Sequence, residues 1–270
     1  MRVGVVGAGG KMGRAVCRAV LDAADLLLVA AVDPGFAGTD LGVLVPGADG
    51  VPVGGDLGIL GDSGAEVVVD FTHLEAARST LAWCVSTGTH AVVGTTGFTD
   101  AELDALRLRF PADVAGGAHC VIAANFAIGA VLMMRFAELA APWFDGAEIV
   151  ELHHDAKLDA PSGTSVRTAE RMAASRTAAG RSAFPDDRTT TVVLDGARGG
   201  AGPGGVRVHS VRLPGLVAHQ EVVLGAVGQS LTIRHDSYDR SSFMDGVLLA
   251  VREVGRRPGL TLGIEPLLGV

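Results

Sequence analysis

The sequence predicts an α/β protein: an N-terminal Rossmann-like, doubly wound parallel sheet, followed by an α+β domain with a mostly antiparallel open sheet. Two observations support the first part. Short apolar runs alternate with helical segments up to about residue 123, and the first run ends in a glycine-rich turn. Continuous apolar runs are typical of parallel strands covered on both faces. A third observation supports the second part, because the later strand segments alternate in the antiparallel manner.

The first half contains five strand segments and three helical segments. The predicted strands cover residues 3–6, 26–32, 67–71, 91–93 and 119–123. The predicted helices cover residues 14–23, 75–87 and 100–110, with Thr99 or Asp100 as the N-cap of the last. Residues 34–55 are rich in Gly, Pro and small side chains, which indicates a surface loop. This alternation predicts an open α/β sheet.

The pattern changes after residue 125. The predicted helices cover residues 128–141, 165–178 and 242–254, and the predicted strands cover 148–152, 190–194, 206–212, 220–225 and 230–235. Residues 181–188 and 196–205 are expected to be mobile loops. The last helix needs an apolar surface to cover, so we expect it to return to the first domain. The predicted domains are residues 1–124 with 239–270, which bind the dinucleotide, and residues 125–238, which bind the substrate and form the oligomer.

Composition and charge exclude several classes of protein. The formal charge of −8 argues against a general nucleic-acid binder, which normally has a basic face. Cys17, Cys84 and Cys120 are scattered without a CxxC pair, so we expect reduced thiols, with a catalytic cysteine as an alternative. The apolar run at 26–32 is too short to span a bilayer, and the N-terminus lacks a signal-peptide pattern. We expect a soluble, cytoplasmic protein without membrane or nucleic-acid partners.

The glycine turn after the first strand predicts a dinucleotide site. It follows a strand, opens a helix, and precedes an acidic residue at the end of the next strand. Glycines at such a turn let the backbone approach a pyrophosphate, and the acidic residue takes the ribose hydroxyls. The expected cofactor-binding residues here are Gly7, Ala8, Gly9, Gly10, Lys11, Met12 and Asp33. Met12 occupies the position of the third glycine, and Gly13 follows it. An ordinary glycine-rich turn is the alternative.

The acidic residue also bears on the choice between NADH and NADPH. Asp33 would repel a 2′-phosphate, and Pro34 stands where an arginine commonly binds that phosphate. Lys11 and Arg14 could approach a phosphate from the glycine turn. We expect NADH to serve as cofactor and leave NADPH open.

Two further segments end strands at the same edge of the predicted sheet. Phe71-Thr72-His73 and Gly94-Thr95-Thr96-Gly97 lie where open α/β sheets bind ligands. We expect Phe71 and Thr72 near the ribose or nicotinamide and regard His73 as a bystander. For the segment Gly94–Gly97, a plain turn is the alternative.

The densest chemistry of the chain lies between Glu151 and Thr164. Adjacent histidines in an extended segment point to opposite sides, and no metal-binding spacing is present, so a metal site is the weaker reading. Ser162, Gly163 and Thr164 open a predicted helix, whose first turn can hold a carboxylate or phosphate. Lys157 adds a fixed positive charge, and His153 can carry a proton near neutral pH. This stretch predicts a site that holds an acid and donates a proton.

The stretch Glu151-Leu-His-His-Asp-Ala-Lys-Leu-Asp-Ala-Pro-Ser-Gly-Thr164 closely resembles the signature of the dihydrodipicolinate reductase family of lysine and diaminopimelate biosynthesis. The resemblance covers almost the whole chain. It implies NAD(P)H-dependent reduction of a cyclic, imine-type hydroxy-dicarboxylate with loss of water. It also implies a homotetramer built through the sheet of the second domain. The chain departs from some relatives at Pro34 and in a longer loop between Asp33 and Gly55, which affects the cofactor preference rather than the reaction.

The resemblance also assigns roles by position. His153 matches the proton donor, Lys157 the second essential cation, and His154 a substrate-binding histidine. Gly163 and Thr164 match the pair that grips a substrate carboxylate. The segments expected near the nicotinamide are Phe71, Thr72, Gly94, Thr95, Thr96, Ala123, Ala124, Asn125 and Phe126. Closure of the two domains over both ligands is expected.

Three alternative functions remain open. The first is another NAD(P)H-dependent reductase or dehydrogenase of a small dicarboxylate or amino acid, which need not use the whole stretch from His153 to Thr164. The second is a non-enzymatic NAD(P)-binding sensor, which would have lost catalytic side chains, whereas His153 and Lys157 are both present. The third is a metal-dependent hydrolase.

Overall fold

The computed structural model describes residues 1–114 and 116–270. These residues form two compact units, of which the first comprises Met1–Ile128 with Arg240–Val270 and the second Gly129–Asp239. The C-terminal segment therefore folds with the N-terminal half. The unit boundaries, at 128/129 and 239/240, lie up to four residues from the expected 124/125 and 238/239.

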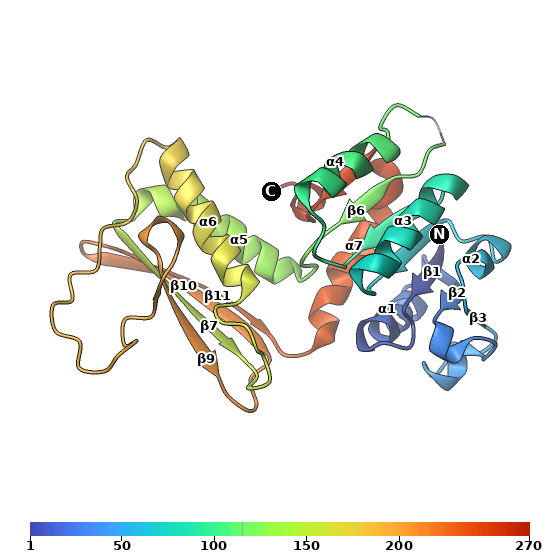
Figure 1. Ribbon diagram of the computed structural model, residues 1–270, viewed down its shortest axis with the longest axis horizontal. Helices are drawn as coiled ribbons and strands as arrows, with labels where there is room; N and C mark the ends of the chain where they lie inside the picture. Colours follow the sequence, from blue (N-terminus) through green and yellow to red (C-terminus); the bar gives the residue numbers. More distant parts are fainter. Residues whose placement is uncertain (115) are drawn as a thin grey trace. The chain divides into compact units, whose positions relative to one another are not determined.

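The first unit is built on a seven-stranded sheet in the order β12-β6-β5-β4-β1-β2-β3 (Figure 1). Its strands are β1 (Arg2–Val6), β2 (Leu27–Val32), β3 (Val53–Gly54), β4 (Val67–Asp70), β5 (His90–Val93), β6 (Cys120–Ile122) and β12 (Leu260–Leu262). Its helices are α1 (Lys11–Asp22), α2 (Gly58–Asp62), α3 (Leu74–Thr87), α4 (Asp100–Arg109), α7 (Met244–Glu253) and α8 (Glu265–Leu268). All pairings of neighbouring strands in this sheet are parallel, which confirms the predicted fold class of the first half.

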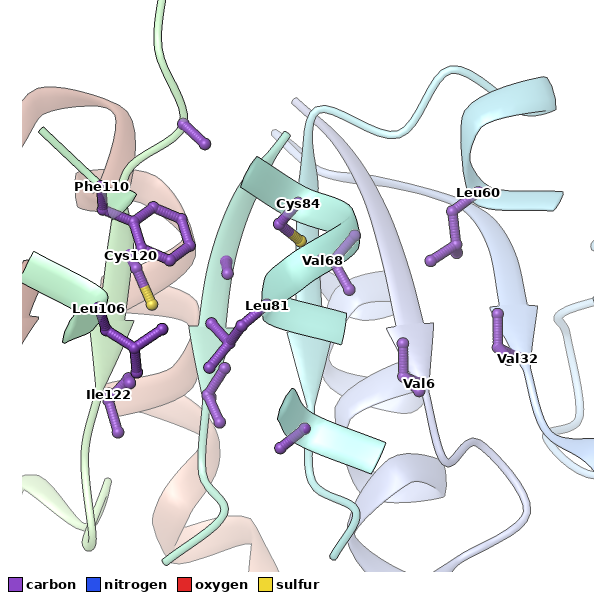
Figure 2. Packing of buried hydrophobic residues seen from close by; sticks show 14 of the residues in the cluster. Val6, Val32, Leu60, Val68, Leu81, Cys84, Leu106, Phe110, Cys120 and Ile122 are labelled. Carbon is purple, nitrogen blue, oxygen red and sulfur yellow. The ribbon is translucent and has the colours of Figure 1, made fainter. Parts of the chain in front are cut away.

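Helical periodicity explains how the helices cover this sheet. Along α3, Ala77, Leu81 and Cys84 recur every three or four residues and are buried in one cluster with Val68 of β4. Figure 2 shows Leu81 and Cys84 beside Val68. Helix α1 contacts β1, β2 and α7. Helix α4 begins with a complete capping box, in which the side chains of Thr99 and Glu102 bind each other's backbone N–H groups.

The second unit pairs a five-stranded sheet, in the order β11-β10-β7-β9-β8, with two helices. Its strands are β7 (Gly146–His153), β8 (Gly200–Ala201), β9 (Arg207–Arg212), β10 (Ala218–Ala226) and β11 (Gln229–Ser237). Its helices are α5 (Ile128–Ala140) and α6 (Gly163–Ala178). Strands β7 and β9 are parallel, and the other three pairings are antiparallel, as expected for a mostly antiparallel sheet. The parallel pair follows from the crossover through α6, which returns the chain to the same end of the sheet.

A buried polar contact ties α6 to the sheet of the second unit. The side chain of Gln220 on β10 accepts a hydrogen bond from Ser165 Oγ at 2.7 Å and donates one to Thr168 Oγ1 at 2.9 Å. All three side chains are buried. The hydrogen bonds offset the cost of burying these polar groups and fix the position of the N-terminal half of α6 along the sheet.

Some predicted elements are wrong or incomplete. Residues 190–194 form no strand in the described chain, and Val192, Val193 and Leu194 are exposed. Their β-branched composition favours an extended backbone, but a strand also needs a partner. The predicted surface loop 34–55 contains two short 3₁₀ turns, strand β3 and buried side chains such as Leu41. The unpredicted β3, β8, β12, α2 and α8 have two to five residues each, too few for a periodic signal.

Candidate active site

The parallel register brings the segments predicted to bind the nucleotide to one edge of the sheet. Val6 lies beside Val32 and Asp70, Asp70 beside Val93, and Val93 beside Ile122. The residues that follow these positions in the chain are Gly7, Asp33, Phe71, Gly94 and Ala123. All five segments therefore begin at the carboxyl edge of the sheet, where folds of this kind bind ligands.

Backbone contacts close the glycine turn. Gly7 has φ +80° and donates its N–H to the Val32 carbonyl oxygen at 2.8 Å, while the Gly10 N–H donates to the Gly7 carbonyl oxygen at 3.0 Å. A Cβ on Gly13 would lie 2.0 Å from that same Gly7 oxygen. Gly13 therefore takes the close-packing role of the third glycine, one residue after Met12.

The N-terminus of α1 is suited to an anion. Its N-cap, Gly10, contributes no side-chain hydrogen bond, and the first turn contains no acidic residue. The first N–H groups and the positive end of the helix dipole therefore meet no carboxylate from this helix. A Cβ on Gly9 would lie 2.5 Å from the ring of Phe36 and 2.7 Å from the Asp33 carboxylate, so only glycine fits against these two side chains.

Asp33 lies where the sequence predicts the ribose ligand. One carboxylate oxygen accepts a hydrogen bond from the Gly9 N–H at 2.8 Å, and the other accepts one from the Gly35 N–H at 3.0 Å. Each carboxylate oxygen has a second lone pair, so the group can still accept hydroxyl groups. The contact with Gly9 couples the acidic residue directly to the glycine turn.

A cavity of about 850 Å³ opens in the first unit beside these groups. Its lining residues are Val6, Gly7, Gly10, Val32, Asp33, Pro34, Gly55, Asp56, Leu57, Gly58, Phe71, Thr72, His73, Ala76, Ser79, Thr80 and Trp83. The volume lies in the range of cofactor sites, and the wall is largely apolar with one carboxylate at the glycine turn. The cavity, the N-terminus of α1 and Asp33 together fit a dinucleotide.

Phe71 explains the glycine at position 94. A Cβ on Gly94 would lie 2.0 Å from the ring of Phe71, so only glycine allows the ring to pack there. The same ring contacts Phe126 with 5.5 Å between centroids. The segments containing Phe71, Gly94 and Phe126, which the sequence predicts near the nicotinamide, therefore adjoin one another.

Asp70 is a residue that sequence reasoning missed. It is fully buried, and one carboxylate oxygen accepts hydrogen bonds from the backbone N–H and the hydroxyl of Thr72, at 2.8 and 2.6 Å. Thr95 donates its hydroxyl to the Thr72 carbonyl oxygen at 3.0 Å. The two strand ends are thereby locked together. The available signal was a carboxylate at the end of the apolar run at 67–69.

The remaining predicted cofactor residues lie outside the cavity wall. Thr96 and Ala124 are exposed, Ala8 and Ala123 are buried, and Lys11 and Met12 belong to the first turn of α1. Asn125 Oδ1 accepts a hydrogen bond from the Ala127 N–H at 2.8 Å, which shapes the turn before α5. His73, regarded as a bystander, lines the cavity, and its ring nitrogen accepts the Ala76 N–H at the start of α3.

In the second unit, the predicted cations lie between the end of β7 and the start of α6. His153 is the last residue of β7 and is half-buried, whereas His154 is exposed. The ammonium group of Lys157 donates to both carboxylate oxygens of Asp159, at 2.8 and 2.9 Å. The Asp159 side chain is 62% exposed, and the Lys157 side chain is 22% exposed.

The N-terminus of α6 offers free N–H groups beside these cations. Ser162 is the N-cap, and its hydroxyl oxygen accepts the Ser165 N–H at 3.2 Å. Within the described chain, the N–H groups of Gly163 and Thr164 have no hydrogen-bond acceptor. The helix end can therefore hold a carboxylate through two N–H donors and its dipole.

Glu151 and Arg212 are the other residues that sequence reasoning missed. The Glu151 side chain is 0% exposed and receives a bidentate pair of hydrogen bonds from the Arg212 guanidinium, at 2.9 and 2.8 Å. Its Oε2 also lies 2.5 Å from Nδ1 of His153. Glu151 opened the predicted stretch without a role, and Arg212 lies 61 residues further along the chain. No local pattern connects the two.

Burial and charge set the protonation of this cluster. Burial raises the pKa of Glu151, but hydrogen bonds from Arg212, Ser210 and His153 more than offset it, so the pKa is lowered. Burial lowers the pKa of His153, and the charges of Lys157 and Arg212 act in the same direction, while Glu151 opposes them. A bound dianion would raise the pKa of His153 and favour its protonated form.

Other candidate chemistries receive little support. All three cysteines are buried, and burial raises the pKa of Cys17 and of Cys84 to about 12, so neither is a ready thiolate. Among residues 1–114 and 116–270, no group of three or more His, Cys, Asp or Glu side chains is arranged to hold a metal ion. In the same part of the chain, the helices are too short or too polar to cross a membrane.

The fold and the two sites define a class: a two-unit protein whose first unit fits a dinucleotide and whose second unit places His153 and Lys157 beside a helix N-terminus. Comparison with known families narrows this class. Residues 1–126 match the family "Dihydrodipicolinate reductase, N-terminus", and residues 129–268 match "Dihydrodipicolinate reductase, C-terminus". The chain belongs to the dihydrodipicolinate reductase family, an oxidoreductase family that uses NAD(P)H.

Individual relatives agree with this assignment. The 4-hydroxy-tetrahydrodipicolinate reductase of Nocardia farcinica is 54% identical over 268 residues, which cover 99% of this chain and 98% of the relative. The enzyme of the same name from Mycolicibacterium vanbaalenii is 52% identical over 268 residues, covering 99% of each chain. A dipicolinate-bound dihydrodipicolinate reductase from Paenisporosarcina sp. TG-14 has been solved. Its structure is similar with a TM-score of 0.86 and 40% identity, and the match covers 98% of both chains.

Proposed function

We propose that this protein reduces 4-hydroxy-2,3,4,5-tetrahydrodipicolinate to 2,3,4,5-tetrahydrodipicolinate, with loss of water and oxidation of NAD(P)H, in the diaminopimelate route to lysine. The observation that carries the proposal is the connection from β7 to α6. It combines an acid, a cation and two free helix N–H groups within twelve residues, in a chain of the dihydrodipicolinate reductase family. The dipicolinate bound to the structural relative supports a ring dicarboxylate as ligand.

The first unit would hold the dinucleotide. The N-terminus of α1 would bind the pyrophosphate, Asp33 the ribose hydroxyls, and the segments at Phe71, Gly94 and Ala123–Phe126 would adjoin the nicotinamide. When bound, the reduced nicotinamide supplies the hydride. The cavity is supporting evidence because its wall includes Gly7, Gly10, Asp33, Phe71 and Thr72.

The second unit would hold the substrate and supply the proton. The N–H groups of Gly163 and Thr164 would bind one carboxylate, and Lys157 would exchange part of its contact with Asp159 for a substrate carboxylate. His154 and Ser162 would complete the site. Ser162 would act chiefly as the N-cap, which leaves the N–H groups of Gly163 and Thr164 available. Water leaves the ring, a hydride adds at C4, and the electron pair displaced onto the conjugated system takes a proton from His153.

The choice of cofactor follows from the glycine turn. Asp33 would repel a 2′-phosphate and favours NADH. Lys11 and Arg14 are exposed on the first turn of α1 and would partly offset this repulsion. NADH is therefore expected to be the better cofactor and NADPH a usable one.

Assembly and location extend the proposal. The face of the second sheet that carries Val150, Leu152 and Val223 is only half-buried in the single chain, which supports a homotetramer built through this sheet. Three buried free thiols support a reducing, cytoplasmic location. Molar mass by light scattering would test the assembly.

Oxidation of NADH and of NADPH by the purified protein tests the proposed reaction. The substrate is generated in place from pyruvate and aspartate semialdehyde by the preceding synthase. Rapid oxidation that depends on the synthase is expected, faster with NADH. Folded protein that binds NADH but oxidises neither cofactor would contradict the proposal and point to another small dicarboxylate or to a sensor.

A further inference from the structure

We propose that Glu151 is a positioning residue that sets the tautomer and orientation of His153, and that Arg212 fixes Glu151 and the Lys157 loop together. This inference rests on the proposed function, because it concerns the proton donor of that reaction. Glu151 and His153 lie two residues apart on β7, so their side chains share one face of the strand. Arg212 lies beside His153 on the neighbouring strand β9.

The carboxylate of Glu151 has no acceptor capacity left. Its Oε2 binds Nδ1 of His153 and one guanidinium nitrogen of Arg212. Its Oε1 binds the other guanidinium nitrogen at 2.8 Å and the Ser162 N–H at 3.3 Å. The Ser210 hydroxyl is a further hydrogen-bond partner, so these contacts saturate the lone-pair sites of an ionised carboxylate. Glu151 is therefore fixed in orientation and serves neither as acid nor as substrate ligand.

This arrangement determines which nitrogen of His153 can give up a proton. A carboxylate held by a bidentate arginine is ionised and only accepts hydrogen bonds, so Nδ1 of His153 must carry a hydrogen. The transferable proton then sits on Nε2. When it leaves, the N–H bond breaks, a C–H bond forms on the substrate, and neutral His153 keeps its Nδ1–H bond to Glu151.

Arg212 also contacts the loop that carries the second cation, Lys157. One of its nitrogens also donates to the backbone carbonyl of Asp159 at 2.7 Å. The Asp159 carboxylate in turn holds Lys157. One guanidinium thus connects the strand that carries His153 with the loop that carries Lys157.

Four charged groups act on His153, and their signs predict the effect of removing Glu151. Glu151 on its own strand favours the imidazolium, while Lys157 from the loop and Arg212 from β9 disfavour it, and a bound substrate dianion favours it. Loss of the Glu151 charge therefore lowers the pKa of His153. Because the reaction needs protonated His153, the rate should fall at a lower pH than in the wild-type protein.

The test compares the pH dependence of kcat in wild-type protein, Glu151→Gln and Glu151→Asp. In Glu151→Gln, the alkaline limb should move down by about one pH unit or more, and kcat at neutral pH should fall about tenfold or more, with NADH affinity unchanged. Glu151→Asp keeps the charge and should restore part of the profile. Glu170→Gln is the control, since Glu170 on α6 pairs with Arg167 and lies outside this cluster. Its profile should equal the wild-type one.

An unchanged profile in folded Glu151→Gln would overturn the proposal while leaving the reductase activity intact. Absence of wild-type turnover would instead refute the proposed function. If Glu151→Gln does not fold, ¹⁵N NMR of the wild-type histidines decides. Neutral His153 protonated at Nδ1 supports the proposal, and protonation at Nε2 overturns it.

Discussion

The glycine turn of the first unit and the Glu151–Thr164 stretch of the second are both proposed to hold an anion, and they differ in the groups that they offer. In the turn, side chains are excluded: a Cβ on Gly13 would lie 2.0 Å from a backbone oxygen, and the binding groups are backbone N–H groups. The second stretch adds the charged side chains of His153 and Lys157 to the backbone N–H groups at the start of α6. Glu151 and Asp159 hold these two side chains.

Because of this difference, we expect the two sites to respond differently to substitutions. An added methyl group should disturb the first site by steric conflict, which changes both binding and stability. Removal of a charged side chain should disturb the second site chemically, with less effect on the fold where that side chain is accessible. The following substitutions test this contrast, from the largest expected effect to the smallest.

Lys157→Ala should lower kcat/KM on the order of 10²–10³-fold, because it removes the fixed positive charge proposed to bind and orient a substrate carboxylate. NADH binding should remain, since Lys157 belongs to the second unit. Steady-state kinetics and NADH titration measure the two effects. Arg167→Ala, which alters an exposed cation on α6, is the control and should turn over normally. Near-wild-type turnover of Lys157→Ala would refute its assigned role.

Asp33→Ala should weaken the binding of NADH by about 1.5–3 kcal/mol, or roughly tenfold to a hundredfold in Kd, because a charged hydrogen-bond acceptor is lost. The affinity for NADPH should fall less, because the same substitution also removes the repulsion between Asp33 and the 2′-phosphate. Calorimetric titration with both cofactors measures the difference. Equal losses would mean that Asp33 does not read the ribose.

Gly13→Ala should lower the free energy of unfolding by about 1–3 kcal/mol, because the new methyl group conflicts with the backbone of Gly7. NADH binding should weaken with it. Gly146→Ala is the matched control, since a Cβ there would meet no atom within 4 Å. Chemical denaturation and NADH titration compare them. Equal behaviour of the two variants would contradict the close-packing role of Gly13.

Thr99→Ala should lower the free energy of unfolding by about 1 kcal/mol through loss of the capping box of α4. This helix lies outside both sites, so kcat and the Kd of NADH should not change. Chemical denaturation measures stability, and kinetics with NADH titration measure the two constants. A change in either constant would show that a loss of stability in α4 also alters the sites.

The sequence predicts the first region well because its signals are local. A strand, a glycine turn, a helix and an acidic residue follow one another within 33 residues, and the parallel register then aligns the strand ends. The cavity wall is less predictable, because Leu57 and Trp83 come from short or distant segments whose composition suggests only packing. Asp70 was missed for a similar reason, as its role depends on Thr72 and on burial.

In the second region, the sequence predicts the charged residues of the site but not the residues that hold them in place. His153, Lys157 and the helix start are adjacent in the chain, whereas Arg212 reaches Glu151 only because β9 pairs with β7. The wrong prediction of a strand at residues 190–194 has the same cause. Their composition favours a strand, but they pair with no other strand in the described chain. Pairing between distant segments is a tertiary property that periodicity does not encode.

Deuterium labelling is the most direct test of the proposed hydride transfer from the dinucleotide to the substrate ring. NADH carrying two deuterium atoms at C4 of the nicotinamide is oxidised in ordinary water by the protein, with synthase-generated substrate, and the product is weighed by mass spectrometry. One deuterium per product molecule is predicted, because a hydride passes from the nucleotide to the ring and His153 supplies an ordinary proton. Oxidation of NADH without deuterium in the product would contradict the account.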